Sequence, residues 1–187
     1  MALEHDIASL VEASEALTST VDNKIQSIDS TVSSKMAEVN SALDDLRTIG
    51  GGGVGTRAIG VANIYTQAGG KNNVHLKLPL KLTEHNEMFH ITVTGYGYGE
   101  GKLVSATFTG YCFKDSDILT NMECTGTHNP MIYRGRDNHV YCRLSFETTY
   151  FLTLSVDTMR VGNGRLIKHG DIEVIFSKNE DASPSPA

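Results

Sequence analysis

The side chains best suited to bind a ligand gather between residues 114 and 138. The segment Lys114–Met131 carries carboxylates, amides and hydroxyl groups over about 17 residues, whereas connections in compact domains usually have about 2 to 6. The run Tyr133-Arg134-Gly135-Arg136-Asp137-Asn138 adds an aromatic ring and two guanidinium groups, a mixture that suits glycans or protein surfaces. The candidate contact residues are Asp115, Asp117, Asn121, Tyr133, Arg134, Arg136 and Asp137. The alternative for each is a solvated turn with a salt bridge.

Metal chemistry is disfavoured by the spacing of the acidic and histidine residues. Asp115 and Asp117 could bind calcium, but they lack the further spaced oxygen ligands of a calcium loop, so a turn or helix-cap role accounts for them. In a strand, His85 and Glu87 point to one face and His90 to the other, which divides the ligands that a zinc site would need. We therefore expect neither a metal nor a cofactor.

Two glycine-rich segments resemble nucleotide-binding loops only in part. Gly50–Gly55 has the GxxxxG spacing, but Thr56 stands where lysine is required, and a helical pattern precedes the loop where a strand is required. Four consecutive glycines prevent helix propagation, so the segment is predicted to be a flexible joint. The run Gly95–Gly101 does not fit GxGxxG; its alternation of glycine with tyrosine predicts a strand that another backbone or a neighbouring subunit approaches closely.

Composition narrows the function classes further. The chain has 187 residues and a net charge of −6, which argues against a dedicated nucleic-acid binder. It contains no GxSxG, HExxH or SxxK motif, and Cys112, Cys124 and Cys142 form no CxxC pair, so we expect reduced thiols, one or two of them buried. No apolar run approaches about 18 residues, and Met1–Asp6 is acidic where a secretion signal would be basic. We expect a soluble, cytosolically made, non-enzymatic protein without membrane insertion.

Residues 1–49 show the strongest periodicity in the chain. They contain no glycine or proline, and their apolar residues recur with a mean step of about 3.6 if Ser14 fills one gap, which predicts one long helix. A step near 3.6 predicts a nearly straight, weakly supercoiled bundle, whereas a step of about 3.5 would supercoil it to the left. The periodic positions, which we call the apolar stripe, are Leu3, Ile7, Leu10, Leu17, Val21, Ile25, Ile28, Val32, Met36, Val39, Leu43 and Leu46.

Such a helix needs partners that cover its stripe. Residues 1–49 hold nine acidic and three basic residues and so carry the whole net charge of −6, which means that like-charged copies must be held together by the stripe. We predict a coiled coil, preferably a homotrimer, because the mixed Ile, Leu and Val positions lack the pattern of parallel dimers. A dimer, or a helix folded back onto its own domain, is the alternative.

From Arg57 onward the apolar period changes to two, which predicts about eight strands. In His75–Leu82 four leucines alternate with other residues, and Pro79 predicts a position near a sheet edge. Without crossover helices, the predicted fold class is an antiparallel, jelly-roll-like β-sandwich joined to the N-terminal coiled coil. The remaining inward positions and strands are Ala58–Tyr65, Phe89, Ile91, Val93, Ala106, Phe108, Cys112, Met131–Tyr133, Val140, Cys142, Leu144, Phe146, Leu152, Leu154, Val156, Ile172, Val174 and Phe176.

These patterns divide the chain into a coiled-coil stalk at 1–49, a glycine linker at 50–56, a β-sandwich head at 57–176 and a tail at 177–187, predicted to be disordered. A stalk, a joint and a compact all-β head resemble the fibre and spike proteins of tailed bacteriophages. The resemblance covers residues 57–176, where the series Phe89–Gly99, Ala106–Tyr111, Arg160–Arg165 and Gly170–Ile172 looks like the C-terminal β-domains of fibre-type proteins of aquatic phages.

The resemblance implies a homotrimeric virion fibre, assembled in the host cytoplasm and mounted on the tail or the capsid. Its N-terminal end would bind other virion proteins, and its head would bind a host-surface glycan or protein through the contact residues named above. Two other functions stay open. One is a structural decoration or connector protein without receptor binding. The other is a polysaccharide depolymerase, which the small head and the lack of an evident carboxylate pair disfavour.

Overall fold

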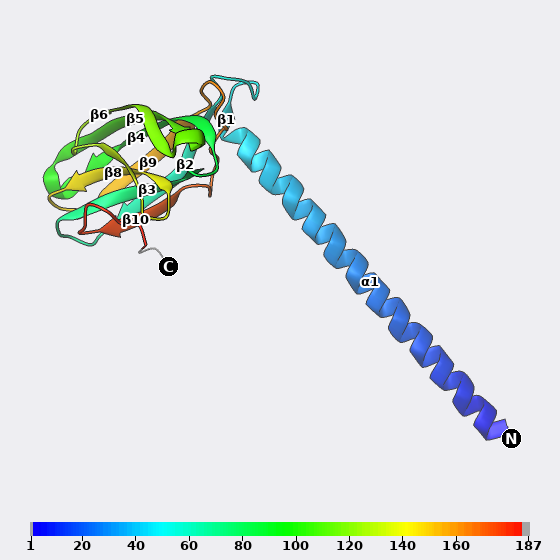
Figure 1. Cartoon of the computed structure of the whole chain (residues 1–187). Helices are drawn as coiled ribbons and strands as arrows, with labels where there is room; N and C mark the ends of the chain where they lie inside the picture. The colour runs from blue at the N-terminus through cyan, green and yellow to red at the C-terminus, as the bar shows by residue number, and fades with distance from the viewer. Residues whose placement is uncertain (1, 185–187) are drawn as a thin grey trace. The chain divides into compact units, whose positions relative to one another are not determined.

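The computed structural model describes residues 2–184, which form one N-terminal helix and an all-antiparallel β part in two sheets (Figure 1). The chain separates into two compact units at the boundary between residues 45 and 46. The coarse prediction of a helix followed by an antiparallel β domain is confirmed. Within the described residues, no helix is long and apolar enough to cross a membrane.

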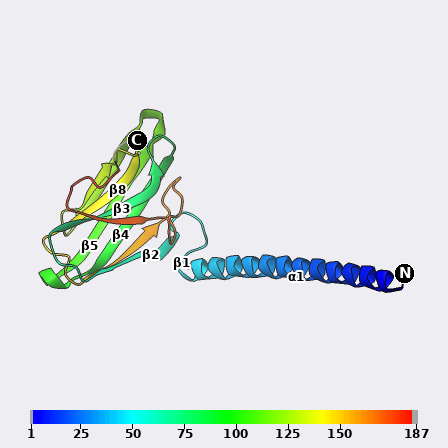
Figure 2. The same ribbon diagram turned by 90° about the horizontal axis from the view of Figure 1, so that it is seen from below.

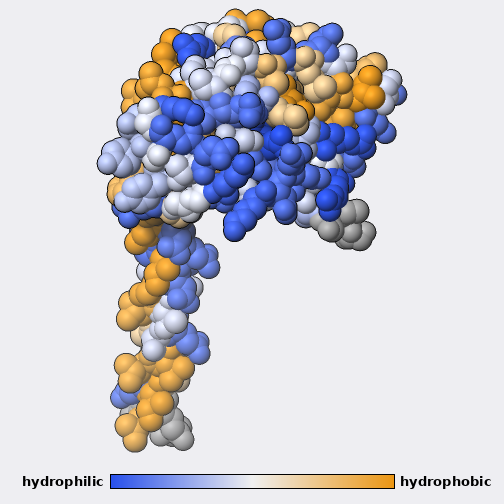
Figure 3. All heavy atoms as spheres, turned by 90° about the vertical axis from the view of Figure 1, so that its left-hand side faces the viewer, coloured by the Kyte–Doolittle hydropathy of each residue, from blue (hydrophilic) through white to orange (hydrophobic). Residues whose placement is uncertain are grey.

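Helix α1 spans Ala2–Leu46, close to the predicted limits. The hydroxyls of Thr18, Thr20 and Thr31 donate to the carbonyls four residues earlier, over 2.8 to 2.9 Å, so these poor helix formers satisfy their polar groups locally. All twelve residues of the apolar stripe are 47% to 82% exposed in the single chain. Figure 3 shows hydrophobic residues following the helix. The helix by itself therefore leaves a long apolar stripe exposed along its length.

The described part of the β unit, residues 46–184, contains ten strands and two short 3₁₀ helices. The strands are β1 Thr48–Ile49, β2 Arg57–Thr66, β3 Asn72–Lys81, β4 Asn86–Gly97, β5 Lys102–Phe113, β6 Ile118–Gly126, β7 Met131–Arg134, β8 His139–Phe146, β9 Leu152–Met159 and β10 Glu173–Ser177; the 3₁₀ helices are η1 Tyr98–Glu100 and η2 Lys114–Ser116. One sheet has the order β1-β2-β9-β4-β5-β6 and the other β10-β3-β8-β7. Every pairing in both sheets is antiparallel.

The two sheets lie one over the other and share a single apolar core (Figure 2). Leu76, Leu78 and Leu80 of β3 face this core with Ile91 of β4 and Phe108 of β5, and each is 2% exposed or less. Cys112 and Cys142 are buried in it as free thiols, as predicted. Alternation along the strands thus predicted the inner faces well, because each strand buries one side only.

Two strand predictions were wrong in detail, and a third agrees with the structure. The expected long loop Lys114–Met131 contains strand β6, which pairs with β5; Asn121 has a positive φ of 48° where that pairing shifts register, and this bulge breaks the apolar alternation. Pro79 lies near a sheet edge as predicted, because β3 is next to the edge strand β10 and the proline is past the last β10 pair at Lys77, at a register shift with β8 between Lys77 and Lys81. Phe176, expected inside, is 42% exposed.

The glycine segment is the loop of a hairpin. Thr48 and Ile49 of β1 pair with Ala58 and Arg57 at the start of β2. Arg160 Nη1 donates to Gly52 O over 2.7 Å, and Gly55 N donates to Arg160 O over 2.8 Å. Gly50, Gly52 and Gly55 all have positive φ, which explains why glycine occupies them. The segment expected to be a free joint is therefore attached to the β unit by a strand pair and an arginine.

The polar tail lies across the outer face of the four-stranded sheet as far as it is described, although it was expected to be disordered. Residues 178–184 form what we call the C-terminal strap; residues 185–187 lie outside the described part. Beneath the strap, His75 is fully buried with its Nδ1 2.8 Å from Tyr133 OH. Four hydrogen bonds attach the strap, from Asn73 Nδ2 to Asn179 O, from Arg143 Nη1 to Glu180 O, from Arg136 N to Ser183 Oγ and from Ala182 N to Tyr133 OH, over 2.9, 3.0, 2.8 and 3.2 Å.

Removal of residues 178–187 should lower the free energy of unfolding and weaken its dependence on pH. Burial lowers the pKa of His75, so the unfolded chain binds this proton more readily than the folded one. The stability due to neutral His75 is complete above pH about 6.5 and is lost as the pH falls below that value. Without the strap His75 is exposed to water, so less stability is lost as the pH falls. The missing hydrogen bonds lower the free energy of unfolding at every pH by about 1 to 3 kcal/mol.

Urea unfolding of the full and shortened chains between pH 8 and pH 5 measures both effects. His90, whose pKa burial also lowers, lies on the other sheet and contributes equally to both chains. Equal midpoints and equal pH dependence in the two chains would show that the strap covers nothing of energetic importance.

Candidate functional site

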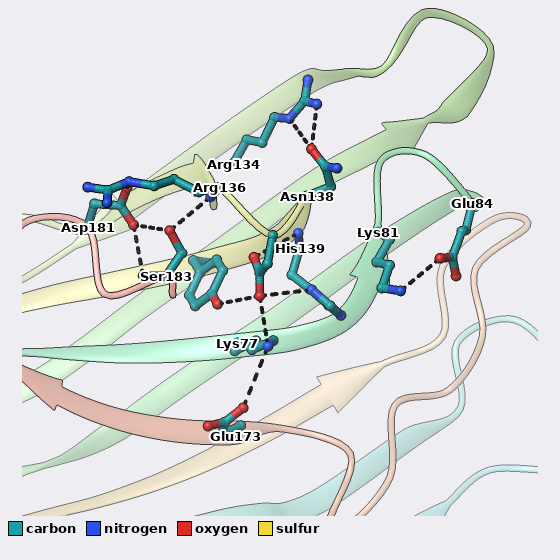
Figure 4. A network of polar contacts seen from close by, with 12 residues as sticks. Lys77, Lys81, Glu84, Arg134, Arg136, Asn138, His139, Glu173, Asp181 and Ser183 are labelled. Atoms are coloured by element: carbon teal, nitrogen blue, oxygen red, sulfur yellow. Dashed lines mark hydrogen bonds and ion pairs between the residues drawn. The ribbon is translucent and has the colours of Figure 1, made fainter. Parts of the chain in front are cut away.

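Several of the predicted contact residues are engaged within the chain, as Figure 4 shows for Arg134 and Arg136. Asp115 lies in η2 and Asp117 follows it with a positive φ of 52°. Arg134 at the end of β7 donates from Nη1 to Asp117 O over 2.9 Å and from Nε to Asn138 Oδ1 over 3.0 Å. The structure therefore brings Asp117 and Arg134 together, joining a turn of one sheet to a turn of the other.

Asp137 acts as an internal acceptor. It is 2.8 Å from Lys77 Nζ and accepts a hydrogen bond from Tyr141 OH over 3.0 Å and another from His139 N over 3.2 Å. Burial of Asp137 opposes ionisation, but the hydrogen bonds from Lys77, His139 and Tyr141 outweigh it and hold the pKa of Asp137 below its ordinary value. Its carboxylate is thus occupied by partners of its own chain.

Two more of these residues contact the strap. Tyr133 stacks on Tyr141 with ring centroids 5.0 Å apart and bonds to His75 and Ala182. Arg136 Nε is 3.3 Å from Asp181 Oδ2 (Figure 4). A structural role accounts for Tyr133, Asp137 and in part for Arg136. That these residues contact a receptor stays a prediction.

A second surface, which the sequence analysis did not single out, lies on the outer face of the six-stranded sheet. Six aromatic side chains of the described residues are at least 37% exposed, and five of them gather at one end of this sheet; the sixth is Phe176. The five are Tyr65 at the end of β2, Tyr96 in β4, Tyr98 in η1, and Tyr150 and Phe151 before β9. We call these five residues the aromatic cluster.

The rings of Tyr65, Tyr98, Tyr150 and Phe151 contact one another, with Phe151 at the centre. Phe151 lies 6.3 Å from Tyr65, 6.0 Å from Tyr98 and 4.7 Å from Tyr150 between ring centroids, each in an edge-to-face arrangement. Gln67 Nε2 donates to Tyr65 OH over 2.9 Å, which fixes the outer end of that ring. Phe151 has a positive φ of 49°, a backbone conformation that costs a bulky residue energy and that its turn must enforce.

The aromatic cluster borders a depression of about 440 Å³ centred on β9. Tyr65 of β2 and Tyr96 of β4 both lie opposite Thr153, and Asn63 and Thr94 both lie opposite Ser155. Thr153 and Ser155 of β9 therefore form the floor of the depression. The two tyrosines flank Thr153, and Asn63 and Thr94 flank Ser155. We call this the aromatic depression; it is lined by Asn63, Ile64, Tyr65, Thr94, Gly95, Tyr96, Thr153, Leu154 and Ser155.

The outer face continues beyond this depression with hydroxyl groups. Register pairs Thr92 with Thr107 and Thr107 with Thr125, and Thr94 with Ser105, so that rows of small polar residues cross the sheet. Two further depressions, of about 230 and 220 Å³, lie along the same face. One is lined by Arg57, His90, Thr92, Asp157, Thr158 and Met159, and the other by Met88, Phe89, His90, Thr109, Gly110, Tyr111, Asn121 and Val161. Of the predicted contact residues, Asn121 thus belongs to this face.

The loops that carry the aromatic cluster are joined by Glu100. Its side chain is 6% exposed, and Oε1 accepts hydrogen bonds from Glu147 N over 2.7 Å and from Thr148 N over 3.2 Å, while Oε2 is 3.2 Å from His128 Nε2. Burial of Glu100 opposes its ionisation, but these backbone hydrogen bonds and His128 lower its pKa overall. One buried carboxylate therefore fixes η1 against the turn that contains Phe151.

Glycine makes this close contact between the loops feasible. A Cβ on Gly99 would lie 2.8 Å from Thr148 Cγ2 and 3.0 Å from Tyr150 Cβ, and Gly99 N donates to Tyr150 O over 2.9 Å. A Cβ on Gly95 would lie 2.1 Å from Thr153 O. The alternation of glycine with tyrosine correctly predicted a close backbone neighbour, which is the chain's own turn and β9. It is also the sequence signal that could have located the tyrosines.

The two candidate regions lie at opposite ends of the six-stranded sheet. Leu152 pairs with both Thr66 and Gly97, which places the aromatic cluster where β2 and β4 end. Asn86 pairs with Phe113, which places η2 and Asp117 where β4 begins. β1 pairs with the start of β2 at this second end. The aromatic cluster therefore lies at the end of the sheet opposite to β1.

Comparison of the chain with protein-family models, curated proteins and solved structures finds no match. Among residues 2–184, no group of three or more His, Cys, Asp or Glu side chains is arranged to hold a metal ion. The site must therefore be interpreted from its own chemistry, which is aromatic, hydroxylated and, at the aromatic depression, uncharged.

Replacement of Glu100 by Gln should loosen both loops of the aromatic cluster. The amide is a weaker acceptor for the Glu147 and Thr148 amides, and the charge opposite His128 is lost, so we expect a loss of about 1 to 3 kcal/mol in the free energy of unfolding. Hydrogen exchange should become faster at Glu147–Phe151. Glu123→Gln is a matched control on exposed β6; equal effects of the two changes would contradict the role given to Glu100.

Proposed function

We propose that the protein is a non-enzymatic, homotrimeric virion fibre of a tailed bacteriophage, whose helices form a coiled coil and whose jelly-roll-like β head attaches to the host surface. The proposal is supported first by the exposed apolar stripe of α1. Fully burying one Val, Leu, Ile or Met side chain stabilises a protein by about 1.5 to 3 kcal/mol, and each chain presents twelve such positions. Association of copies through the stripe removes this apolar surface from water.

The composition of the helix supports self-association over contact with an oppositely charged partner. Residues 1–49 carry six more acidic than basic residues, and α1 has no basic residue in its last turn. The stripe mixes Leu, Ile, Val and Met, which favours a trimer over a parallel dimer. The N-terminal part of such a bundle would bind other virion proteins, on the tail or on the capsid.

Three linked heads would attach firmly to a host surface even if each head binds its receptor weakly. Linking binding sites raises overall avidity by about 10² to 10⁴ without any new contact, provided that the sites can engage together. The head in turn offers a solvent-facing sheet with an exposed aromatic cluster, a feature that monomeric proteins seldom leave uncovered without a function. We therefore assign attachment to the head and multivalency to the helix.

Replacing Ile25 and Ile28 together by Asn should convert the trimer to monomers. Both side chains belong to the stripe and are more than half exposed in the single chain, so their burial depends on other copies. Light scattering of the full-length protein measures the mass, and circular dichroism should show a loss of helix, because a lone helix of this composition is weakly stable. Ser30→Asn with Ser34→Asn, on the opposite face, is the control and should leave the trimer intact.

A wild-type monomer at micromolar concentration would refute the proposed assembly, and a stable dimer would refute its stoichiometry. Immunogold labelling of purified virions with an antibody against the β unit should mark particles and distinguish tail from capsid. Absence of the protein from purified particles would refute the virion assignment. Release of reducing sugar from host polysaccharide would refute the non-enzymatic part.

A further inference from the structure

We propose that the aromatic depression binds a neutral glycan, with one pyranose ring held between Tyr65 and Tyr96. This inference rests on the proposed function and names the ligand class and the site for it. It differs from the sequence-based expectation, because that expectation placed receptor contacts at the opposite end of the sheet.

The residues around the depression match the two kinds of surface on a sugar. A pyranose ring has an apolar face of C–H groups, which packs on an aromatic ring, and an edge of hydroxyls, which donate and accept hydrogen bonds. Tyr65 and Tyr96 are 58% and 44% exposed and supply the rings. Asn63, Thr94 and Ser155 line the same depression and supply amide and hydroxyl groups. A volume of about 440 Å³ lies within the range of small-ligand sites.

The depression favours neutral over acidic sugars. None of its nine lining residues is Asp, Glu, Lys, Arg or His. In the neighbouring depression Arg57 and Asp157 are paired with each other over 3.3 Å, and Lys102, opposite Gly97, lies 3.8 Å from Glu100. None of the residues that line the aromatic depression therefore offers a cation to a carboxylate or sulfate group on a sugar. Neutral hexoses and N-acetylhexosamines meet this chemistry.

The site is preorganised, which reduces the entropic cost of weak binding. Gln67 and Phe151 hold the ring of Tyr65, and Glu100 holds the turn that carries Phe151. Tyrosine loses little side-chain freedom on binding, because it has only two rotatable χ angles. The strained backbone of Phe151 is consistent with a turn kept in place for the position of its side chain.

A second copy of the sheet is a poorer occupant of this face. Two sheets that stack bury interdigitating apolar side chains, whereas the outward positions here are Thr, Ser, Asn and Tyr. Stacking would bury hydroxyls of Thr94, Thr153 and Ser155 without assured partners, at a cost for each. A glycan, in contrast, brings a matching set of hydroxyl groups to the same positions.

The test is binding of the full-length protein to an array of neutral oligosaccharides built from glucose, galactose, mannose and N-acetylhexosamines, with sialylated and uronic acid oligosaccharides as acidic counterparts. Tyr65→Ala and Tyr96→Ala should each weaken binding to the recognised neutral glycan by about tenfold or more, as loss of a central aromatic contact does. Tyr65→Phe, which keeps the ring, should retain most of the binding. Phe176→Ala removes an exposed aromatic from the other sheet and should have no effect.

Several results would overturn the inference: binding to no neutral glycan, binding to acidic glycans alone, or equal weakening by Phe176→Ala and Tyr65→Ala. Light scattering of the same samples shows whether the protein is a trimer, so failure of the glycan inference can be told apart from failure of the proposed function. Loss of oligomers in Tyr65→Ala would show that the depression is a contact between copies and would overturn the inference too. A monomeric wild type that still binds the neutral glycan through Tyr65 would refute the trimeric fibre and support the glycan site.

Discussion

Burial of the inner faces of two sheets against each other is the constraint on which the β unit depends. Every leucine from Leu76 to Leu82 at alternate positions points into the shared core, as do Ile91, Phe108 and Val156 from the opposite sheet. Because side chains alternate along a strand, this burial forces the intervening residues outward. Around the aromatic depression the residues forced outward are Asn63, Tyr65, Thr94, Tyr96, Thr153 and Ser155, whereas Arg57, Met88, His90 and Asp157 face outward toward the other end of the same strands. The composition of the outer face is thus independent of the core and free to serve recognition.

Local periodicity was sufficient to predict the helix limits, most strands and the inward residues. It failed where long-range contacts decide the outcome. Nothing within 118–126 reveals that a bulge at Asn121 lets this segment pair with β5, and no local feature shows that residues 178–184 bond to Asn73, Arg143 and Tyr133. Pro79 was a reliable local signal, because a proline suits the unpaired stretch of β3 beyond Lys77 and the register shift beside it.

The candidate site was harder to predict than the fold for a related reason. Tyr65, Tyr96 and Phe151 are separated by up to 86 residues in the sequence and meet only through the pairing of β2, β9 and β4. The predicted contact residues, in contrast, are neighbours in sequence, where polar clusters attract attention. Several of them turned out to satisfy one another, as Asp137 does with Lys77 and Tyr141. A polar cluster is therefore weaker evidence of binding than exposed aromatic rings that need no partner for stability.

The short pairing of β1 with β2 has a mechanical consequence for a protein that is pulled through its N-terminal helix. Tension along the chain reaches the β unit first at Thr48 and Ile49, which pair with only two residues at the margin of the sheet. That pair can separate while the core stays intact, because neither residue is buried in it. Once the two hydrogen bonds to Arg160 also break, the glycine segment 50–56 would extend by about 3.5 Å per residue before load reaches β2, so it would take up the first part of any tension between the helix and the β unit.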